Sequence, residues 1–403
     1  MKRTGTGFGK SFLVLSIILI TLSYAGTLQA ADKAWTIMIY VDADNSLQEA
    51  LMEDVNEMEM VGSSDDVNIV VEIDRLNKNM KGFKGEPWDN TRRYFIKKDD
   101  DSKEIKSELL ENMPEQNMGD PQTLVDFIKF CHEKYPAQKY ALILENHGDG
   151  WRKANRGTDR GICEDDTSND KLTLPELKSA LELGTCGLGK KFDAMEFDAC
   201  LMAMLEVSSQ IRNYVEFASF SQEEEPGAGN PYDKLLTQIK GSTDGKGFVM
   251  AVVQTYLDSY SSNVTKSAVD MSKLPALEKA VDEFAKTSIE KMKDAAPGIK
   301  AAIDETKSFR IATYKDFDDF IDRFNAKYHD QQIRDKVVAA HAAFMAAVIK
   351  NGKTENANGL SIWIPKDKAE FKSRPDYLEL EMNLSTAWGE FLGNYFEKAL
   401  TGN

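Results

Sequence analysis

Short apolar runs alternate with helix-like patterns through the first half of this 403-residue chain. The runs predict strands at residues 36–42, 67–74, 140–146, 193–199 and 215–221, and the segments between them predict helices at 47–60, 121–134, 174–183 and 201–212. Strands that are apolar along their whole length are buried on both faces, which is typical of parallel sheets covered by helices. The pattern therefore predicts an α/β/α sandwich around a mostly parallel sheet, with a further side strand at 92–97.

The second half of the chain has a different pattern. Helices are predicted at 275–293, 299–306, 314–328, 333–350 and 386–400, with one strand at 359–365. We therefore expect an α/β domain over residues 31–265 and a mostly helical C-terminal lobe over 266–403. The strand near 359–365 is expected to return to the main sheet.

The N-terminus has the pattern of a secretory signal peptide. Lys2, Arg3 and Lys10 precede an apolar run at 11–25, which is followed by a short segment ending at Ala30. Residues 1–30 are therefore predicted to direct export, to the periplasm or outside the cell, and then to be removed. Because the residue three positions back from cleavage after Ala30 or Ala31 would be Leu28 or Gln29, which are not small, a retained N-terminal anchor remains an alternative.

Charge and hydropathy exclude several classes of partner. The chain holds 50 Lys and Arg against 66 Asp and Glu, a formal net charge of −16, so it lacks the basic surface that nucleic acid or anionic lipid requires. After the signal segment no apolar run is long enough to cross a bilayer. We expect a soluble mature chain without a membrane span, and a monomer.

Two predicted strands lead directly into reactive side chains. The strand at 140–146 precedes His147 and Gly148, and the strand at 193–199 precedes Cys200. Parallel strands end at one edge of the sheet, so His147 and Cys200 are expected to meet there. The predicted helix at 201–212 would place Cys200 at a positive helix end that favours thiolate. His147 could protonate a leaving amine, and the backbone N–H groups of Gly148 and Cys200 could stabilise an oxyanion.

The cysteines also allow an inert interpretation. A single Cys at a strand end is more often a buried core residue than a nucleophile. Four cysteines are too few for a disulfide scaffold in a chain of this length, although Cys163 and Cys186 are the favoured pair if one forms. No cysteine or histidine spacing fits a zinc site.

Four segments together resemble one peptidase family. The sequences at 37–48, 145–151, 196–207 and 221–233 are similar to the clostripain family of cysteine peptidases, which is grouped with caspases, gingipains and legumains. The resemblance implies a caspase-like fold whose catalytic domain is the segment 31–265. It also implies that His147 and Cys200 form a dyad and hydrolyse peptide bonds through a thioester acyl-enzyme.

The resemblance further implies cleavage after Arg or Lys. Asp198 occupies the matching position for the acid that would bind the basic side chain. The sequence departs from the family at Ala228, where a second acid is common, and Glu223 and Glu225 are candidates to replace that acid in the substrate pocket. Three consecutive acids at 223–225 are also compatible with a solvated rim.

Family members often cut their own chain between His and Cys. The predicted loop at 149–171 contains several basic residues, and Arg160 before Gly161 is the first candidate for self-processing. The chemistry requires no cofactor, but calcium is a candidate ligand on the resemblance. Asp42, Asp44, Asp165 and Asp166 offer carboxylate ligands, although neither acidic segment matches an EF-hand loop.

The sequence thus predicts an exported cysteine endopeptidase that acts on proteins or peptides. The alternative is a catalytically inactive extracellular binding protein on the same caspase-like scaffold.

Overall fold

The computed structural model describes residues 1–2, 5, 32–76, 87–151, 161–261, 264–352 and 354–399. Residues Asp32–Asn403 form one compact unit. The predicted signal peptide lies almost entirely outside the described residues, and the domain boundary at residue 265 stays a prediction. None of the helices in the described ranges combines the length and the apolar character that crossing a bilayer requires.

A nine-stranded sheet forms the centre of the described unit, in the order β12-β10-β9-β8-β5-β1-β2-β3-β4. The five central strands, from β9 to β2, are parallel to one another. At one edge β10 pairs antiparallel with both β9 and β12, and at the other edge β3 pairs antiparallel with both β2 and β4. The strands are β1 (Lys33–Ala43), β2 (Val67–Arg75), β3 (Arg92–Phe95), β4 (Glu108–Asn112), β5 (Ala137–Glu145), β8 (Ala194–Asp198), β9 (Phe217–Phe220), β10 (Lys266–Asp270) and β12 (Val348–Gly352).

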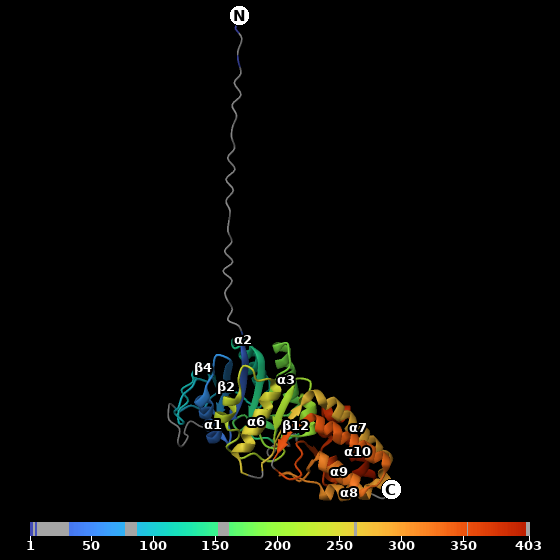
Figure 1. The fold of residues 1–403 in the computed structure, drawn as a ribbon. Helices are drawn as coiled ribbons and strands as arrows, with labels where there is room; N and C mark the ends of the chain where they lie inside the picture. Colours follow the sequence, from blue (N-terminus) through green and yellow to red (C-terminus); the bar gives the residue numbers. More distant parts are fainter. Residues whose placement is uncertain are drawn as a thin grey trace. The chain divides into compact units, whose positions relative to one another are not determined.

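Helices follow most of these strands (Figure 1). The α-helices are α1 (Gln48–Val61), α2 (Pro121–Lys134), α3 (Leu174–Leu188), α4 (Leu205–Ile211), α5 (Tyr232–Gln238), α6 (Gly245–Ser259), α7 (Leu274–Glu290), α8 (Met292–Glu305), α9 (Phe317–Lys327), α10 (Gln331–Ala347), α11 (Lys368–Lys372), α12 (Glu381–Ser385) and α13 (Trp388–Gly393). Two 3₁₀ turns, η1 (Met271–Lys273) and η2 (Pro375–Glu379), and a π-helical turn, η3 (Asn394–Ala399), complete the C-terminal half.

Local sequence signals explain where several helices begin. Asp120 caps α2 by accepting a hydrogen bond from the N–H of Gln122 at 2.8 Å, and Pro121 occupies the first turn. Thr173 and Glu176 form the capping box predicted for α3. The helix ends where Gly189 adopts a left-handed conformation.

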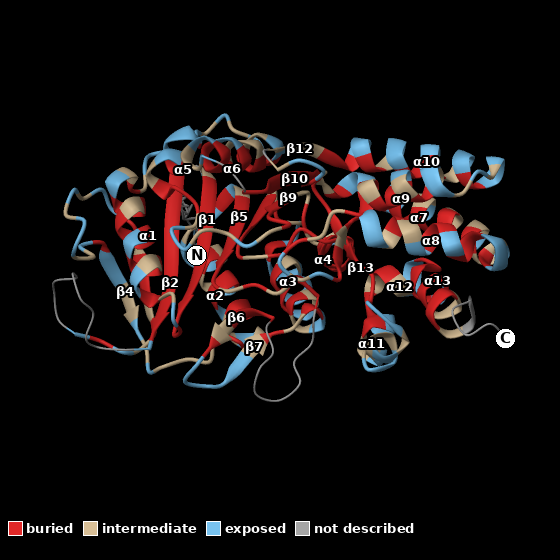
Figure 2. Cartoon of the chain, turned by 90° about the horizontal axis from the view of Figure 1, so that it is seen from below, coloured by how far each residue is buried: buried red, intermediate tan, exposed pale blue. Residues whose placement is uncertain are grey.

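The sheet separates two hydrophobic cores, as the sandwich prediction requires. On β1, Ile37 and Ile39 point into a core shared with α1, α5 and α6, whereas Met38 and Tyr40 point into a core shared with α2 and α3. Figure 2 shows the buried strands between these two groups of helices. Because alternate side chains of one strand enter both cores, β1 is apolar along its length. The predicted fold class is confirmed.

The predicted return of the strand near 359–365 to the main sheet is wrong. That segment forms β13 (Ser361–Trp363), which pairs with β11 (Tyr314–Asp316) in a separate two-stranded sheet. Two N–H groups of β13 donate to residues in and just before α4. The Ser361 N–H donates to the Ala203 carbonyl and the Trp363 N–H donates to the Glu206 carboxylate, both at 2.8 Å. The main sheet instead receives β12, which the sequence pattern had merged with the preceding helix.

Candidate active site

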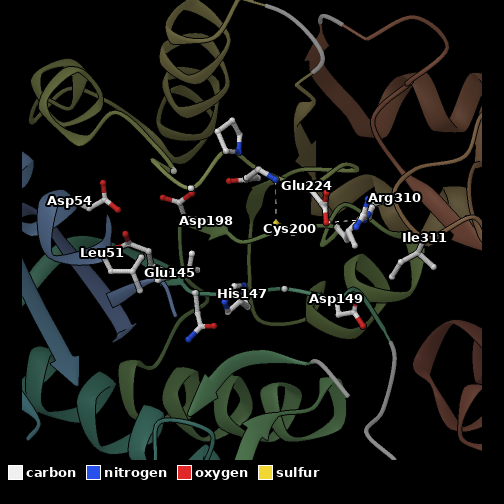
Figure 3. Close-up of a pocket in the computed structure, with 18 of the residues that line it drawn as sticks. Leu51, Asp54, Glu145, His147, Asp149, Asp198, Cys200, Glu224, Arg310 and Ile311 are labelled. Carbon is white, nitrogen blue, oxygen red and sulfur yellow. Dashed lines mark hydrogen bonds and ion pairs between the residues drawn. The ribbon is translucent and has the colours of Figure 1, made fainter. Parts of the chain in front are cut away.

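The register of β5 and β8 brings His147 and Cys200 together. Glu145 pairs with Asp198 in the parallel ladder, and the Asn146 N–H donates to the Asp198 carbonyl at 3.2 Å. His147 and Cys200 each follow two residues after these paired positions, so both leave the sheet at the same edge. Both line one pocket of about 600 Å³ (Figure 3). The structure therefore places both side chains at one pocket, and their role as a catalytic dyad stays a prediction.

Gly148 packs directly against the backbone of the candidate nucleophile. A Cβ atom at this position would collide with the Cys200 carbonyl and would lie 2.9 Å from the Ala199 Cβ. Only glycine allows this close approach of the two chain segments. Gly148 and Cys200 both line the pocket, so their predicted role as oxyanion donors stays compatible with their placement.

Ser46 is a partner of His147 that the sequence analysis missed. Its hydroxyl lies 2.9 Å from Nε2 of His147, and it belongs to the segment between β1 and α1. β1 is the neighbour of β5 in the sheet, so its carboxyl end reaches the same edge as His147. The sequence signal was the position of Ser46 after a buried parallel strand, where loops carry functional side chains.

The segment after His147 is anchored to the C-terminal half of the chain. The Trp151 ring contacts Trp363 and Tyr377, with centroid distances of 4.9 and 4.6 Å. The Tyr314 hydroxyl donates to the Asp149 carbonyl at 2.5 Å. Arg310, Ile311 and Arg374 also line the pocket, so residues after 265 form part of its wall.

The predicted helix N-terminus at Cys200 is wrong. Leu201 has a left-handed backbone with φ of 64°, and α4 begins only at Leu205. Between Cys200 and α4, two N–H groups donate to the segment after β9. The Leu201 N–H donates to the Glu223 carbonyl at 3.2 Å, and the Ala203 N–H donates to the Ser221 carbonyl at 2.8 Å. The Cys200 thiol therefore lacks the helix-end stabilisation that the sequence suggested.

Burial raises the pKa of the Cys200 thiol to about 11. The Glu225 N–H donates to Sγ at 3.2 Å and lowers the pKa in part, but the carboxylates of Glu225, Glu224 and Asp198 raise it further. Cys200 is consequently a thiol near neutral pH in the unliganded pocket, and it needs a base to become a nucleophile.

Asp198 lines the pocket that holds Cys200, and its role towards substrate stays a prediction. Its carboxylate is 5% exposed and accepts hydrogen bonds from the Asn230 N–H at 2.9 Å and the Tyr232 hydroxyl at 3.0 Å. Gly229 closes over it, because a Cβ there would lie 2.8 Å from Oδ2. These partners fix the orientation of the carboxylate towards the cavity.

Asp54 and Glu145 also line the pocket, and neither was predicted. Asp54 comes from α1 and Glu145 from the end of β5, and Figure 3 shows both on the Asp198 side of the cavity. Asp54 and Glu145 are 3% and 1% exposed, so both residues are almost fully removed from water. Burial and mutual repulsion raise the pKa of Asp54, and burial with the nearby Asp198 raises that of Glu145. The part of the pocket around Asp198, Asp54 and Glu145 is thus acidic, and the ion pairs described for acids of the pocket lining involve Glu224 and Glu225 instead.

The acidic run at 223–225 divides into three environments. Glu223 does not line the pocket, which corrects its prediction, because its carboxylate turns to accept the Arg310 N–H at 2.9 Å. Glu224 lines the pocket and pairs with Arg310 at 3.3 Å. Glu225 lines the pocket, but it is paired with the buried Lys266 at 2.7 Å. Its charge is therefore largely compensated.

The remaining predicted residues have mixed outcomes. Asp44 and Asp165 come together with Asp74 and Glu115, whereas Asp42 and the exposed Asp166 are not members of that group. All four cysteines are described and free, so the suggested pairing of Cys163 with Cys186 does not form. Arg160 lies outside the described residues.

Known proteins resemble the chain over most of its length. A family model described as the clostripain family matches residues 39–392. Clostripain from Hathewaya histolytica is 29% identical over 399 residues, which cover 84% of this chain and 76% of that protein.

Solved structures show the same fold. A secreted C11 cysteine protease from Bacteroides thetaiotaomicron, bound to an irreversible peptide inhibitor, superposes with a TM-score of 0.64 at 20% identity, covering 88% of this chain and 99% of that one. An inactive zymogen C11 protease from Parabacteroides distasonis gives 0.66 at 21% identity with the same coverage. The predicted family is confirmed: the chain belongs to the clostripain family of cysteine peptidases.

Proposed function

We propose that the protein is an exported endopeptidase that cleaves after Arg or Lys, with Cys200 as nucleophile and His147 as acid and base. The observation that carries the proposal is the single pocket in which His147 and Cys200 adjoin the carboxylates of Asp198, Asp54 and Glu145. A nucleophile and a proton carrier at the mouth of an acidic cavity suit hydrolysis next to a cationic side chain.

Acylation follows from the roles of the two side chains. The proposal takes Nε2–H of His147 as the donor to the Ser46 hydroxyl, 2.9 Å away, which leaves Nδ1 as the nitrogen that accepts the thiol proton. The Cys200 thiolate attacks the scissile carbonyl, and the N–H groups of Gly148 and Cys200 stabilise the resulting oxyanion. The C–N bond breaks as His147 returns the proton to the leaving amine, which leaves a thioester.

Deacylation uses the same groups. Water attacks the thioester while His147 takes one of its protons, and the C–S bond then breaks. The proton passes to the departing thiolate, so the enzyme regains its neutral thiol and releases a carboxylic acid product.

The acidic pocket supports selection of a basic side chain. Asp198 is held by Asn230 and Tyr232, so it is oriented before substrate binds. Asp54 and Glu145 extend the negative charge away from Cys200 (Figure 3). Ala228 does not line the cavity, so an acid at that position is not needed to make this pocket negative.

Export and self-processing belong to the same proposal. The apolar segment at 11–25 supports export, and the relative from Bacteroides thetaiotaomicron is described as secreted. We further propose cleavage between Arg160 and Gly161, in the segment 149–171 that separates the dyad residues. An Arg160→Ala protein that is fully active and still cut at the same place would refute this processing site.

Reporter peptides test the proposal directly. We would compare peptides ending in Arg, Lys or norleucine before the leaving group, using the mature protein, Cys200→Ala and His147→Ala. We expect cleavage of the Arg and Lys peptides by the unmodified protein and loss of cleavage in both variants. Cleavage of norleucine equal to that of Arg would refute the pocket assignment. No cleavage by folded, reduced protein would favour the inactive binding protein instead.

A further inference from the structure

The small sheet formed by β11 and β13 contacts both segments that carry the proposed dyad. The two strands pair antiparallel, with Tyr314 opposite Trp363 and Asp316 opposite Ser361. All four of these residues are 0% exposed. The sheet therefore lies in the interior of the described unit, where water does not compete for its hydrogen bonds.

β11 reaches the turn after His147 through Tyr314. The Tyr314 hydroxyl donates to the Asp149 carbonyl at 2.5 Å. The ring packs against the next residue, because a Cβ at Gly150 would lie 2.8 Å from Cε2 of Tyr314. Gly150 has a left-handed backbone with φ of 71°, a conformation that favours glycine. The turn after His147 thus fits closely against this one tyrosine.

β13 reaches the segment after Cys200, and it lies beside α4 (Figure 2). The Ser361 N–H and hydroxyl both donate to the Ala203 carbonyl, at 2.8 and 3.0 Å. The Trp363 N–H donates to the Glu206 carboxylate at 2.8 Å. Because Tyr314 and Trp363 are paired across the two strands, the small sheet joins the turn after His147 to the segment after Cys200.

The hydroxyl of Tyr314 gives this connection its direction. Trp151 also packs on Trp363, with ring centroids 4.9 Å apart, but an aromatic contact tolerates sliding. A hydrogen bond fixes both the distance and the angle between its two groups. Ser46 contacts the imidazole ring of His147, whereas Tyr314 holds the backbone two residues later. Different parts of the chain therefore hold the ring and the backbone of the histidine segment.

We propose that Tyr314 is a positioning residue for His147, and that the β11–β13 sheet holds the His147 turn in place relative to Cys200. The inference deepens the proposed function and rests on it. Proton transfer among the thiol, the imidazole and the leaving amine requires groups within hydrogen-bond reach, so a small displacement of His147 slows the reaction. Tyr314 does not line the pocket, so it acts through the Asp149 carbonyl.

Tyr314→Phe and Tyr40→Phe form a matched pair of variants. Tyr40 is also 0% exposed, and its hydroxyl also donates to a backbone carbonyl, that of Met118 at 2.9 Å. Neither Tyr40 nor Met118 lines the pocket. Each variant loses one buried hydrogen bond and keeps the ring, so the thermal unfolding temperature Tm should fall by a similar amount in both.

Steady-state kinetics with the Arg reporter separates the two variants. Tyr314→Phe should lower kcat about tenfold and leave KM within about twofold, because the His147 turn shifts while the acidic part of the pocket is unchanged. Tyr40→Phe should leave both constants within about twofold of the parent. An equal fall of kcat in both variants, or an unchanged kcat in Tyr314→Phe, would overturn the positioning role.

The leaving group distinguishes misplacement of His147 from general damage to the site. An amine must receive a proton from His147 as it leaves, whereas nitrophenolate leaves without one. Tyr314→Phe should therefore lower kcat/KM for an Arg anilide about fivefold more than for the nitrophenyl ester of the same peptide. Equal losses with both substrates would assign the effect to general damage and overturn the inference.

A readout without turnover keeps the inference separate from the proposed function. In Cys200→Ala protein labelled with ¹³C-histidine, the His147 ring signal is identified by its loss in His147→Ala. Tyr314→Phe should shift this signal, and Tyr40→Phe should leave it in place. An unshifted signal in Tyr314→Phe would overturn the inference. If the parent protein cleaves no reporter, the proposed function fails, while the histidine signal still decides whether Tyr314 positions His147.

Discussion

Replacing Glu145 with Gln tests whether the acidic pocket is built for a cation at the expense of stability. Glu145 is almost fully buried at the end of β5. The titratable groups that face it are Asp54 from α1, Asp198 from β8 and Tyr232 from α5, with Glu57 of α1 further along. Three of these four are acids, and no described Lys or Arg pairs with Glu145. A neutral glutamine of the same shape removes the charge and keeps the packing.

The magnitude follows from the titration of the buried pair. Burial raises the pKa of Glu145 from 4.5 to about 8, and Asp54 shares this titration. An acid whose pKa is raised by folding leaves the free energy of unfolding unchanged at pH values below its unfolded pKa, where it is protonated in both states. It lowers the free energy of unfolding as pH rises from the unfolded pKa towards the folded pKa. At about pH 7 the cost is about 3 kcal/mol, from the 1.36 kcal/mol that each pKa unit represents. Glu145→Gln should recover this amount at pH 7 and little near pH 4.5.

Chemical unfolding of the Cys200→Ala protein, with and without Glu145→Gln, measures this difference across pH. Glu206→Gln is the matched control. Glu206 is equally buried, and its pKa is raised to about 7, but it bonds to Trp363 and Tyr377 outside the pocket. For both variants, the free energy of unfolding relative to the parent should increase as pH rises from about 4.5 to 7. In the protein that retains Cys200, only Glu145→Gln should lower the ratio of kcat/KM for Arg over norleucine, by about tenfold or more.

Two outcomes would refute this reasoning. A stability difference between Glu145→Gln and its parent that does not change with pH would show that Glu145 is not protonated by burial. An unchanged Arg over norleucine ratio would show that the side chain before the scissile bond does not reach this part of the cavity.

Three further changes probe the dyad itself. Ser46→Ala removes the contact to Nε2 of His147, so steady-state kinetics should show kcat about tenfold lower with KM unchanged. An unchanged kcat would contradict the proposal that Ser46 orients His147. Alkylation of Cys200 by iodoacetamide should accelerate about tenfold per pH unit from neutral pH upward, because its pKa is about 11, whereas a plateau near neutral pH would show a preformed thiolate. Gly148→Ala should reduce kcat/KM by about a hundredfold or more while circular dichroism stays unchanged, because its Cβ meets the Cys200 carbonyl, and near-normal activity would show that the backbone can shift.

The parts of the fold that depend on local pattern were predictable. The strands β1, β2 and β5 are buried on both faces, so their sequences are apolar without interruption and their ends were predicted within a few residues. The start of α4 was not, because residues 201–204 are apolar and helix-compatible. The backbone N–H groups of Leu201 and Ala203 are instead bonded to Glu223 and Ser221, which are distant in the sequence. Long-range hydrogen bonds of this kind leave no local signal.

The site divides along the same line. Three residues of the site follow or end buried parallel strands: His147, Cys200 and Asp198. Their position at one edge of the sheet could therefore be predicted from the strand pattern alone. Asp54 lies within α1, and only the packing of that helix brings its carboxylate to Glu145. Glu223 was predicted to line the pocket but does not. Its carboxylate accepts the Arg310 N–H instead, and that long-range contact could not be read from the local sequence.

The pocket and Cys200 share one electrostatic environment, which links the proposed specificity to the proposed catalysis. The pKa of Cys200 is raised first by burial and then by carboxylates that include Glu225 and Asp198. A cationic side chain beside Asp198 would cancel part of that negative field and lower the pKa of the thiol. It would also remove the reason for Glu145 to hold a proton. An Arg or Lys substrate should therefore increase kcat as well as lower KM, whereas an uncharged side chain of similar length would enter a pocket whose nucleophile stays protonated.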